Sequence, residues 1–95
     1  MYARVVRFTD VTAERISEIV AQVEESEGPP PGVDSVGFEL CVDESHGTAI
    51  FVGYFETEQK MLDASAVFEQ MDPSETPGTR ASVDLSEVKV QRRFP

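Results

Sequence analysis

The stretch that decides the fold runs from Gly47 to Met71 and reads GTAIFVGYFETEQKMLDASAVFEQM. Up to Phe55, apolar residues fall on both faces of an alternating strand, which indicates a strand buried on both sides. Thr57 can cap a helix that follows almost without a loop, and apolar residues at three- and four-residue spacing give this helix an inward stripe. The stripe comprises Met61, Ala64, Ser65, Phe68 and Met71. A strand covered on both faces needs further strands beside it and layers above and below it.

The N-terminal part of the chain predicts a second interior strand followed by a helix. Residues 2–8 alternate with apolar side chains on both faces, interrupted by Arg4 on one side and Arg7 on the other. Each arginine either extends its head group to the rim of the sheet or lines a pocket. Thr9, Asp10 and Thr12 are N-cap candidates for a helix that continues to Glu27, and Gly28 with the prolines at 29–31 ends it. Its apolar stripe comprises Ala13, Ile16, Ile19, Val20 and Val23.

Two more strands complete the pattern. Residues 33–44 have one apolar and one mixed face, which is typical of an edge strand, and the tight connection at 44–47 joins them to the next strand as a hairpin. Asp72-Pro73 ends the second helix, and residues 72–79 are expected to form a surface loop. The last strand spans 81–92, and its apolar parity switches, so we expect a bulge or a break near Ser86-Glu87.

The resulting order, strand-helix-strand-strand-helix-strand, predicts one α+β domain over residues 1–95. Right-handed crossovers and an adjacent hairpin give a ferredoxin-like, four-stranded antiparallel sheet of order 4-1-3-2 with both helices on one face. The first and third strands then lie in the centre, which agrees with their two apolar faces. The pattern does not decide which sheet face meets the helices. Because the other face also carries apolar residues, a second copy packing sheet to sheet is expected to cover it.

Composition excludes several classes of partner. Eighteen acidic residues against eight basic ones give a net charge of −10, which argues against a nucleic-acid backbone or an anionic membrane surface as partner. The longest apolar run, residues 49–55, is too short to span a bilayer. The single cysteine, Cys41, excludes an intrachain disulfide and is expected to be a buried, inert thiol. With no signal-peptide pattern at the start, we expect a cytoplasmic protein.

Four short motifs spread over essentially the whole chain carry a family resemblance. They are Met-Tyr-Ala-Arg-Val at 1–5, Pro31-Gly32, Val42-Asp43 and Tyr-Phe-Glu-Thr at 54–57. With them the chain resembles the antibiotic biosynthesis monooxygenase superfamily, the dimeric α+β barrels, and most closely its small bacterial members without an assigned reaction. The resemblance implies a homodimer with a pocket between sheet and helices.

The characterised members of that superfamily suggest two kinds of chemistry. Some oxygenate polycyclic aromatic quinols without a cofactor. Others degrade haem with an Asn, a Trp and a His, a set that cannot be transferred, because this chain has no Asn and no Trp and its only histidine, His46, falls in the hairpin turn. We therefore expect no cofactor.

No catalytic motif is recognisable. No His, Cys and Asp cluster has metal-ligand spacing, and no glycine-rich phosphate loop or nucleophile elbow occurs. His46 is expected to be a solvated turn residue. Arg4, Arg7 and Tyr54 are the candidates for polar contacts with a ligand.

Two functions remain open from the sequence. The first is a homodimeric, cofactor-independent oxygenase or binder of a small aromatic or quinone-like molecule, with a dry pocket and few polar groups. The second is a non-catalytic dimeric binding or interaction module whose interior is filled by large side chains. Those side chains would be Phe51, Phe55, Met61 and Phe68.

Overall fold

Six elements in the expected order make up the fold. A computed structural model describes residues 1–72 and 76–95. The elements are β1 (Tyr2–Thr9), α1 (Ala13–Glu25), β2 (Gly37–Asp43), β3 (Thr48–Phe55), α2 (Glu58–Glu69) and β4 (Thr79–Glu87). The predicted alternation of strands and helices is confirmed, and the observed strands are shorter than expected at β2 and at the end of β4.

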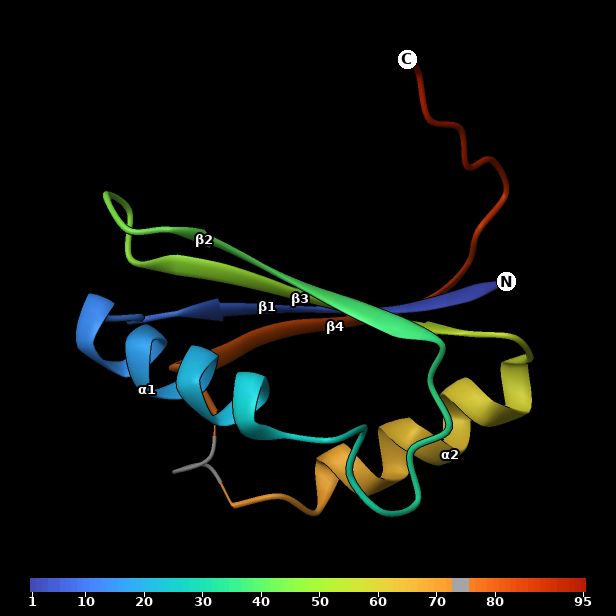
Figure 1. Cartoon of the computed structure of the whole chain (residues 1–95), viewed down its shortest axis with the longest axis horizontal. Helices are drawn as coiled ribbons and strands as arrows, with labels where there is room; N and C mark the ends of the chain where they lie inside the picture. The colour runs from blue at the N-terminus through green and yellow to red at the C-terminus, as the bar shows by residue number, and fades with distance from the viewer. Residues whose placement is uncertain (73–75) are drawn as a thin grey trace.

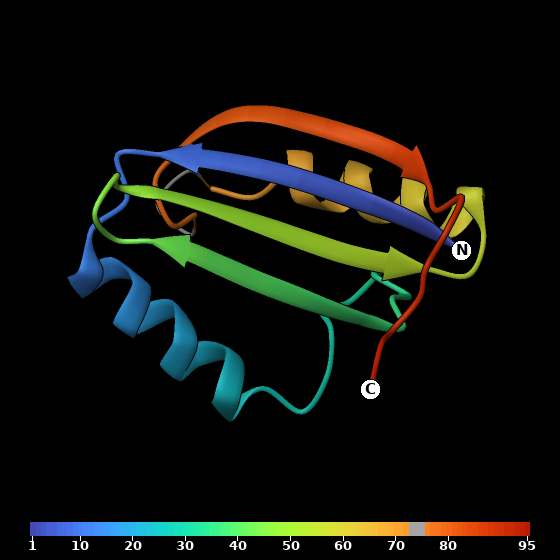
Figure 2. The same ribbon diagram turned by 90° about the horizontal axis from the view of Figure 1, so that it is seen from above.

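The four strands form one antiparallel sheet. Its order is β2-β3-β1-β4, which is the predicted order read from the other edge (Figure 2). β1 and β3 therefore lie in the centre, as their patterns indicated. In the register between them, Val6 lies opposite Phe51 and Arg4 lies opposite Gly53. β2 pairs with β3 along its whole length and is an edge strand.

Both helices lie on the same side of the sheet (Figure 1). Each begins at a threonine predicted as a cap. The Thr12 hydroxyl accepts a hydrogen bond from the Arg15 amide at 3.1 Å, and the Thr57 hydroxyl accepts one from the Lys60 amide, also at 3.1 Å. These bonds satisfy amides that the first helical turn leaves without a backbone partner.

The register settles which sheet face meets the helices. The residues of β1 that share a face with Val6 point towards the helices, and the residues of β2 and β3 that pair with them lie on the same face. This inner face carries Val6, Phe8, Phe38, Leu40, Phe51 and Phe55. The other face, which we call the open face, carries Val5, Arg7, Glu39, Cys41, Ile50, Val52 and Tyr54. The inner face thus takes the larger apolar side chains.

The core is divided into two clusters. One holds Val6, Phe8, Val11, Ile16 and Ala49, and the other holds Val33, Phe55, Met61 and Ala64. α2 lies under β1 and its neighbours, whereas α1 lies beyond the β2 edge (Figure 2). Of the apolar stripe expected on α1, only Ile16 and Ile19 are buried, and Val20 and Val23 are exposed. The apolar stripe of α1 is therefore only partly buried in the core.

Several expected boundaries change. β2 begins at Gly37 rather than at residue 33, because the approach to it folds into a turn in which the Val33 amide donates to the Pro30 carbonyl at 3.1 Å. β4 ends at Glu87, so the expected change in the alternation of apolar residues is explained by a break in the strand. The register shift lies opposite Arg7 and Phe8 of β1. Part of the predicted 72–79 loop, residues 73–75, lies outside the described residues.

The last eight residues, 88–95, form an extended arm without strand pairing. The arm leaves the sheet at the end of β4, where the Val88 amide donates to the Met1 carbonyl at 2.9 Å. It then crosses the end of the sheet on the side of the open face (Figures 1 and 2). Val90 and Phe94 on this arm are 80% and 77% exposed.

Candidate functional site

A cavity of about 590 Å³ lies between the inner face of the sheet, the two helices and the loop that leads into β2. It exists because α1 lies beyond the β2 edge and leaves the inner face of β2 without a helix directly over it (Figure 2). Five of the six phenylalanines line this inner cavity, so its surface is largely aromatic. They are Phe8, Phe38, Phe51, Phe55 and Phe68.

Arg4 is the buried charge of the inner cavity. β1 directs it to the inner face, where it is 5% exposed. Its Nε donates to the Ser65 hydroxyl of α2 at 3.2 Å, and its Nη2 lies 3.8 Å from a carboxylate oxygen of Glu69. Burial lowers the pKa of Arg4, and the Glu69 carboxylate offsets this only in part. Among the described residues its terminal nitrogens make no hydrogen bond, so they retain donor capacity at the cavity wall.

Aromatic rings continue outward from Arg4. Its guanidinium carbon lies 4.8 Å from the centre of the Phe68 ring, within the range of a cation–π contact. Phe68 meets Phe51 edge to face at 6.5 Å, and Phe51 stacks on Phe38 at 5.2 Å. Phe38 is 45% exposed at the sheet edge. The rings thus extend from the buried charge to the rim of the cavity.

Glu69 is bound mainly by a second arginine. Arg80 donates to both carboxylate oxygens, at 2.7 and 2.8 Å. These bonds lower the pKa of Glu69 and raise that of Arg80. The distance of 3.8 Å between Arg4 and Glu69 exceeds hydrogen-bond length, so Arg4 interacts with this carboxylate only electrostatically.

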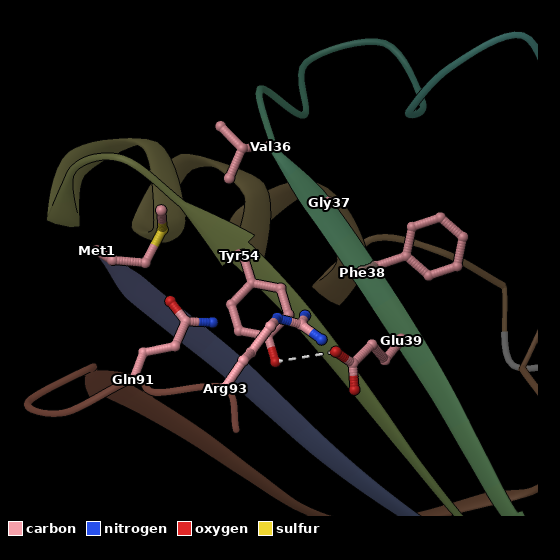
Figure 3. A pocket seen from close by; sticks show the side chains of 8 residues that line it. All are labelled: Met1, Val36, Gly37, Phe38, Glu39, Tyr54, Gln91 and Arg93. Carbon is pink, nitrogen blue, oxygen red and sulfur yellow. Dashed lines mark hydrogen bonds between the residues drawn. The ribbon is translucent and has the colours of Figure 1, made fainter. Parts of the chain in front are cut away.

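Tyr54 belongs to a smaller pocket on the open face. This terminal pocket, of about 270 Å³, lies between the start of β2, the end of β3 and the C-terminal arm. Figure 3 shows Gln91 and Arg93 of the arm beside the Tyr54 ring. The Tyr54 hydroxyl donates to Glu39 at 3.4 Å. Burial, followed by the charge of Glu39, raises the pKa of Tyr54.

The structure does not bring the three candidate residues together. Arg4 lies in the inner cavity, whereas Arg7, which is exposed, and Tyr54, which is partly buried, lie on the opposite side of the sheet. Sequence reasoning did not identify Ser65 and Glu69 as neighbours of Arg4. Ser65 was visible as a polar residue in an apolar helical stripe, which is a usable signal for a buried polar contact. No local sequence pattern predicts that Glu69 lies near Arg4, because its position depends on how α2 crosses the sheet.

His46 and Cys41 lie away from the inner cavity. The His46 side chain is 76% exposed in the hairpin turn, with its Nδ1 2.7 Å from Asp43 and 3.1 Å from the Ser45 hydroxyl. Both partners meet the same ring nitrogen, so this is not the relay of a Ser-His-Asp triad. Hydrogen bonds from Ser45, then from His46, lower the pKa of Asp43. Cys41 is exposed, so the expectation of a buried thiol was wrong.

In residues 1–72 and 76–95, no three His, Cys, Asp or Glu side chains gather as metal ligands. In the same residues, no helix has the length and apolar character needed to cross a membrane. No family model, curated protein or solved structure matches the chain.

Proposed function

We propose that the protein binds a small aromatic or quinone-like molecule in the inner cavity. The observation that carries the proposal is the cavity itself, whose volume of about 590 Å³ lies in the range of small-molecule sites. Such sites combine an apolar lining with a few placed polar groups. Here the lining is aromatic, and Arg4 supplies a buried polar contact. Flat aromatic ligands suit this lining because rings stack in offset or edge-to-face contacts.

The contacts around the cavity favour this reading over a filled interior. Phe55 and Met61 are fully packed in the core, at 1% and 3% exposure. Phe51 and Phe68, the other two residues expected to fill the space, are only partly buried and line the cavity instead. A ligand would remove their remaining surface from water, which is a favourable contribution to binding.

The chemistry that we propose beyond binding is oxidation without a cofactor, as in the antibiotic biosynthesis monooxygenase superfamily that the chain resembles. The bound substrate would supply all the electrons: one oxygen atom of O₂ would become the new C=O oxygen on a ring carbon, and the other would leave as water with the two hydrogens of that carbon. The protein would hold the substrate away from bulk water and place its oxygen near Arg4. Binding alone, without a reaction, is the simpler form of the same proposal.

Ligand screening and oxygen uptake test the two forms separately. A panel of naphthoquinols and anthrones is screened first by calorimetry and then in an oxygen electrode. Val23→Trp places a large ring at the cavity wall on α1, and it should weaken every ligand that binds. Val20→Trp is the matched control, because Val20 is exposed on the same helix and does not line the cavity. Binding that is equal in both variants would refute the site, and binding without oxygen uptake would refute the oxygenase.

We also propose that the working form is a homodimer joined through the open face. Val5, Ile50 and Val52 form an apolar strip there, and Ile50 is 37% exposed. The arm at 88–95 carries three basic and no acidic residues, while the rest of the chain has eighteen acids against five bases. A second copy offers this arm both an acidic surface and cover for Val90 and Phe94.

Sedimentation equilibrium tests the dimer directly. Ile50→Glu puts a charge in the centre of the open face and should give a monomer. Leu62→Glu is the control, because Leu62 is 40% exposed on α2, on the other side of the sheet, and this variant should remain dimeric. A monomeric wild-type protein at micromolar concentration would refute the dimer and leave the ligand proposal intact.

A further inference from the structure

Arg4 is a charge without a full set of partners. Among the described residues it makes one hydrogen bond, from Nε to Ser65. A buried cation is costly unless it is paired and hydrogen-bonded. The nearest carboxylate, Glu69, already accepts two short bonds from Arg80 and stays 3.8 Å from Arg4. The terminal nitrogens of Arg4 are therefore the strongest unused donors of the inner cavity.

The surroundings hold the guanidinium in place without using those nitrogens. The guanidinium lies over the Phe68 ring, and its Nε donates to the Ser65 hydroxyl, so these two contacts fix its position. Its partner on β3 is Gly53, and the Phe55 ring lies 3.3 Å from the position that a Cβ on Gly53 would take. Gly53 lines the inner cavity together with Arg4. Because Arg4 itself lines the cavity, a ligand group held there can reach its terminal nitrogens.

The charges of the cavity wall differ from those of the whole protein. The chain carries a net charge of −10, but the charged residues lining the inner cavity are Arg4, Arg80 and Glu27. Glu27 is exposed on the loop after α1, whereas Arg4 is buried. Arg80 is paired with Glu69, so Arg4 is the charge of this lining that is buried and has no hydrogen-bonded carboxylate. A negatively charged ligand group fits this lining better than a neutral or positive one.

We propose that the ligand of the inner cavity is an aromatic carboxylate. Its carboxylate binds the free nitrogens of Arg4, and its ring system lies along Phe68, Phe51 and Phe38. Arginine suits this role because its planar fork matches a carboxylate, and such charge-assisted bonds are stronger than neutral ones. The inference rests on the proposed binding function and specifies the chemical class of the ligand.

A pair of probes with the same ring and different charge tests the class. The probes are 2-naphthoate and its neutral amide, 2-naphthamide, titrated at neutral pH. The chain has no tryptophan, so naphthalene fluorescence can be followed without a tryptophan background. We expect 2-naphthoate to bind at least about tenfold more tightly, the lower end of what one charge-assisted hydrogen bond contributes. Arg4→Gln should remove this preference and leave 2-naphthamide binding nearly unchanged.

Two further variants control for charge and for folding. Arg7→Gln removes the same charge from the same strand, but Arg7 is exposed on the open face and lines neither cavity, so the preference should persist. Glu69→Gln removes the carboxylate that competes for Arg4 and should tighten 2-naphthoate binding by a factor of about three to ten without tightening 2-naphthamide. It replaces a half-exposed side chain, so it tests the inference even where Arg4→Gln does not fold.

The outcomes separate this inference from the function on which it rests. Equal affinity for the two probes in the wild-type protein, or unchanged 2-naphthoate binding in Glu69→Gln, would overturn the carboxylate assignment and leave a binder of neutral aromatics. Failure of both probes and of the whole quinol panel to bind would overturn the binding function itself. A preference lost equally in Arg7→Gln and Arg4→Gln would also refute the role of Arg4, because it would show a general effect of charge.

Discussion

Replacing Arg4 with methionine should leave the protein folded and as stable as before, or more stable. The change removes one hydrogen bond to Ser65 and one contact with Phe68. It also removes the desolvation penalty of a buried cation, which is several kcal/mol. Glu69 is not left unpaired, because Arg80 binds both of its oxygens. Buried methionine adds roughly 1.5–2 kcal/mol of apolar burial and a sulfur contact to the ring.

The expected sum of these contributions is a gain of zero to about 2 kcal/mol in the free energy of unfolding. If Arg4 instead holds β1 to α2 as a structural ion pair, its removal should cost about 3–5 kcal/mol. The two cases are far enough apart to be distinguished in one experiment. The distinction matters for function, because a buried charge that destabilises the fold is more readily explained by ligand binding than by folding.

Urea unfolding followed by far-ultraviolet circular dichroism measures the difference. With a slope of about 1–2 kcal/mol per M for a domain of this size, a structural role would lower the midpoint of Arg4→Met by about 1.5–5 M. Arg7→Met, exposed on the same strand of the single chain, should stay within about 0.5 kcal/mol of its parent when both variants are compared as monomers in the Ile50→Glu background. A midpoint that falls by more than about 1 M in Arg4→Met while Arg7→Met is unchanged would refute the reasoning.

Three further predictions concern the fold and its pH dependence. Phe55→Ala should cost about 3–5 kcal/mol, because the ring is 1% exposed, and a loss below about 1.5 kcal/mol in urea would contradict that packing. Gly78→Ala should cost at least about 1–3 kcal/mol, because the added Cβ would lie 2.3 Å from a backbone oxygen at the end of β1. Gly28→Ala is the control and should be neutral, because a Cβ there meets nothing within 4 Å. Equal melting temperatures of the two variants would contradict the close approach at Gly78. Hydrogen bonds from Arg80 lower the pKa of Glu69. The pair therefore stabilises the fold at pH values above the ordinary glutamate pKa, and this contribution is lost as the pH falls through the lowered pKa. A difference in the free energy of unfolding between wild type and Glu69→Gln that stays constant from neutral to acid pH would rule this out.

The fold could be predicted because its decisive signals are local. Apolar residues on both faces of residues 2–8 and 48–55 required two central strands, and the short turn at 44–47 required a hairpin. Chain connectivity then left one strand order. The caps at Thr12 and Thr57 were also predictable, because a capping threonine bonds an amide three residues away.

The site could be predicted only in part because it depends on tertiary placement. Arg4 and Arg7 were identified as candidates on opposite sides of one strand, but alternation alone does not say which side meets the helices. The cavity follows from the position of α1 beyond β2, and a helix with the same stripe over the sheet would have closed it. Cys41 was misjudged for a related reason, since an edge strand leaves its open face in water.

The two outer strands also affect how the protein behaves on storage. β2 and β4 each have one side without a strand partner, which leaves backbone donors and acceptors able to pair with another molecule. Each edge carries two carboxylates, Glu39 and Asp43 on one and Asp84 and Glu87 on the other. At neutral pH these like charges keep molecules from adding strand to strand. Acidification removes that repulsion, so slow fibrous aggregation through β2, whose sequence is the more apolar, should set the lower pH limit for concentrated solutions.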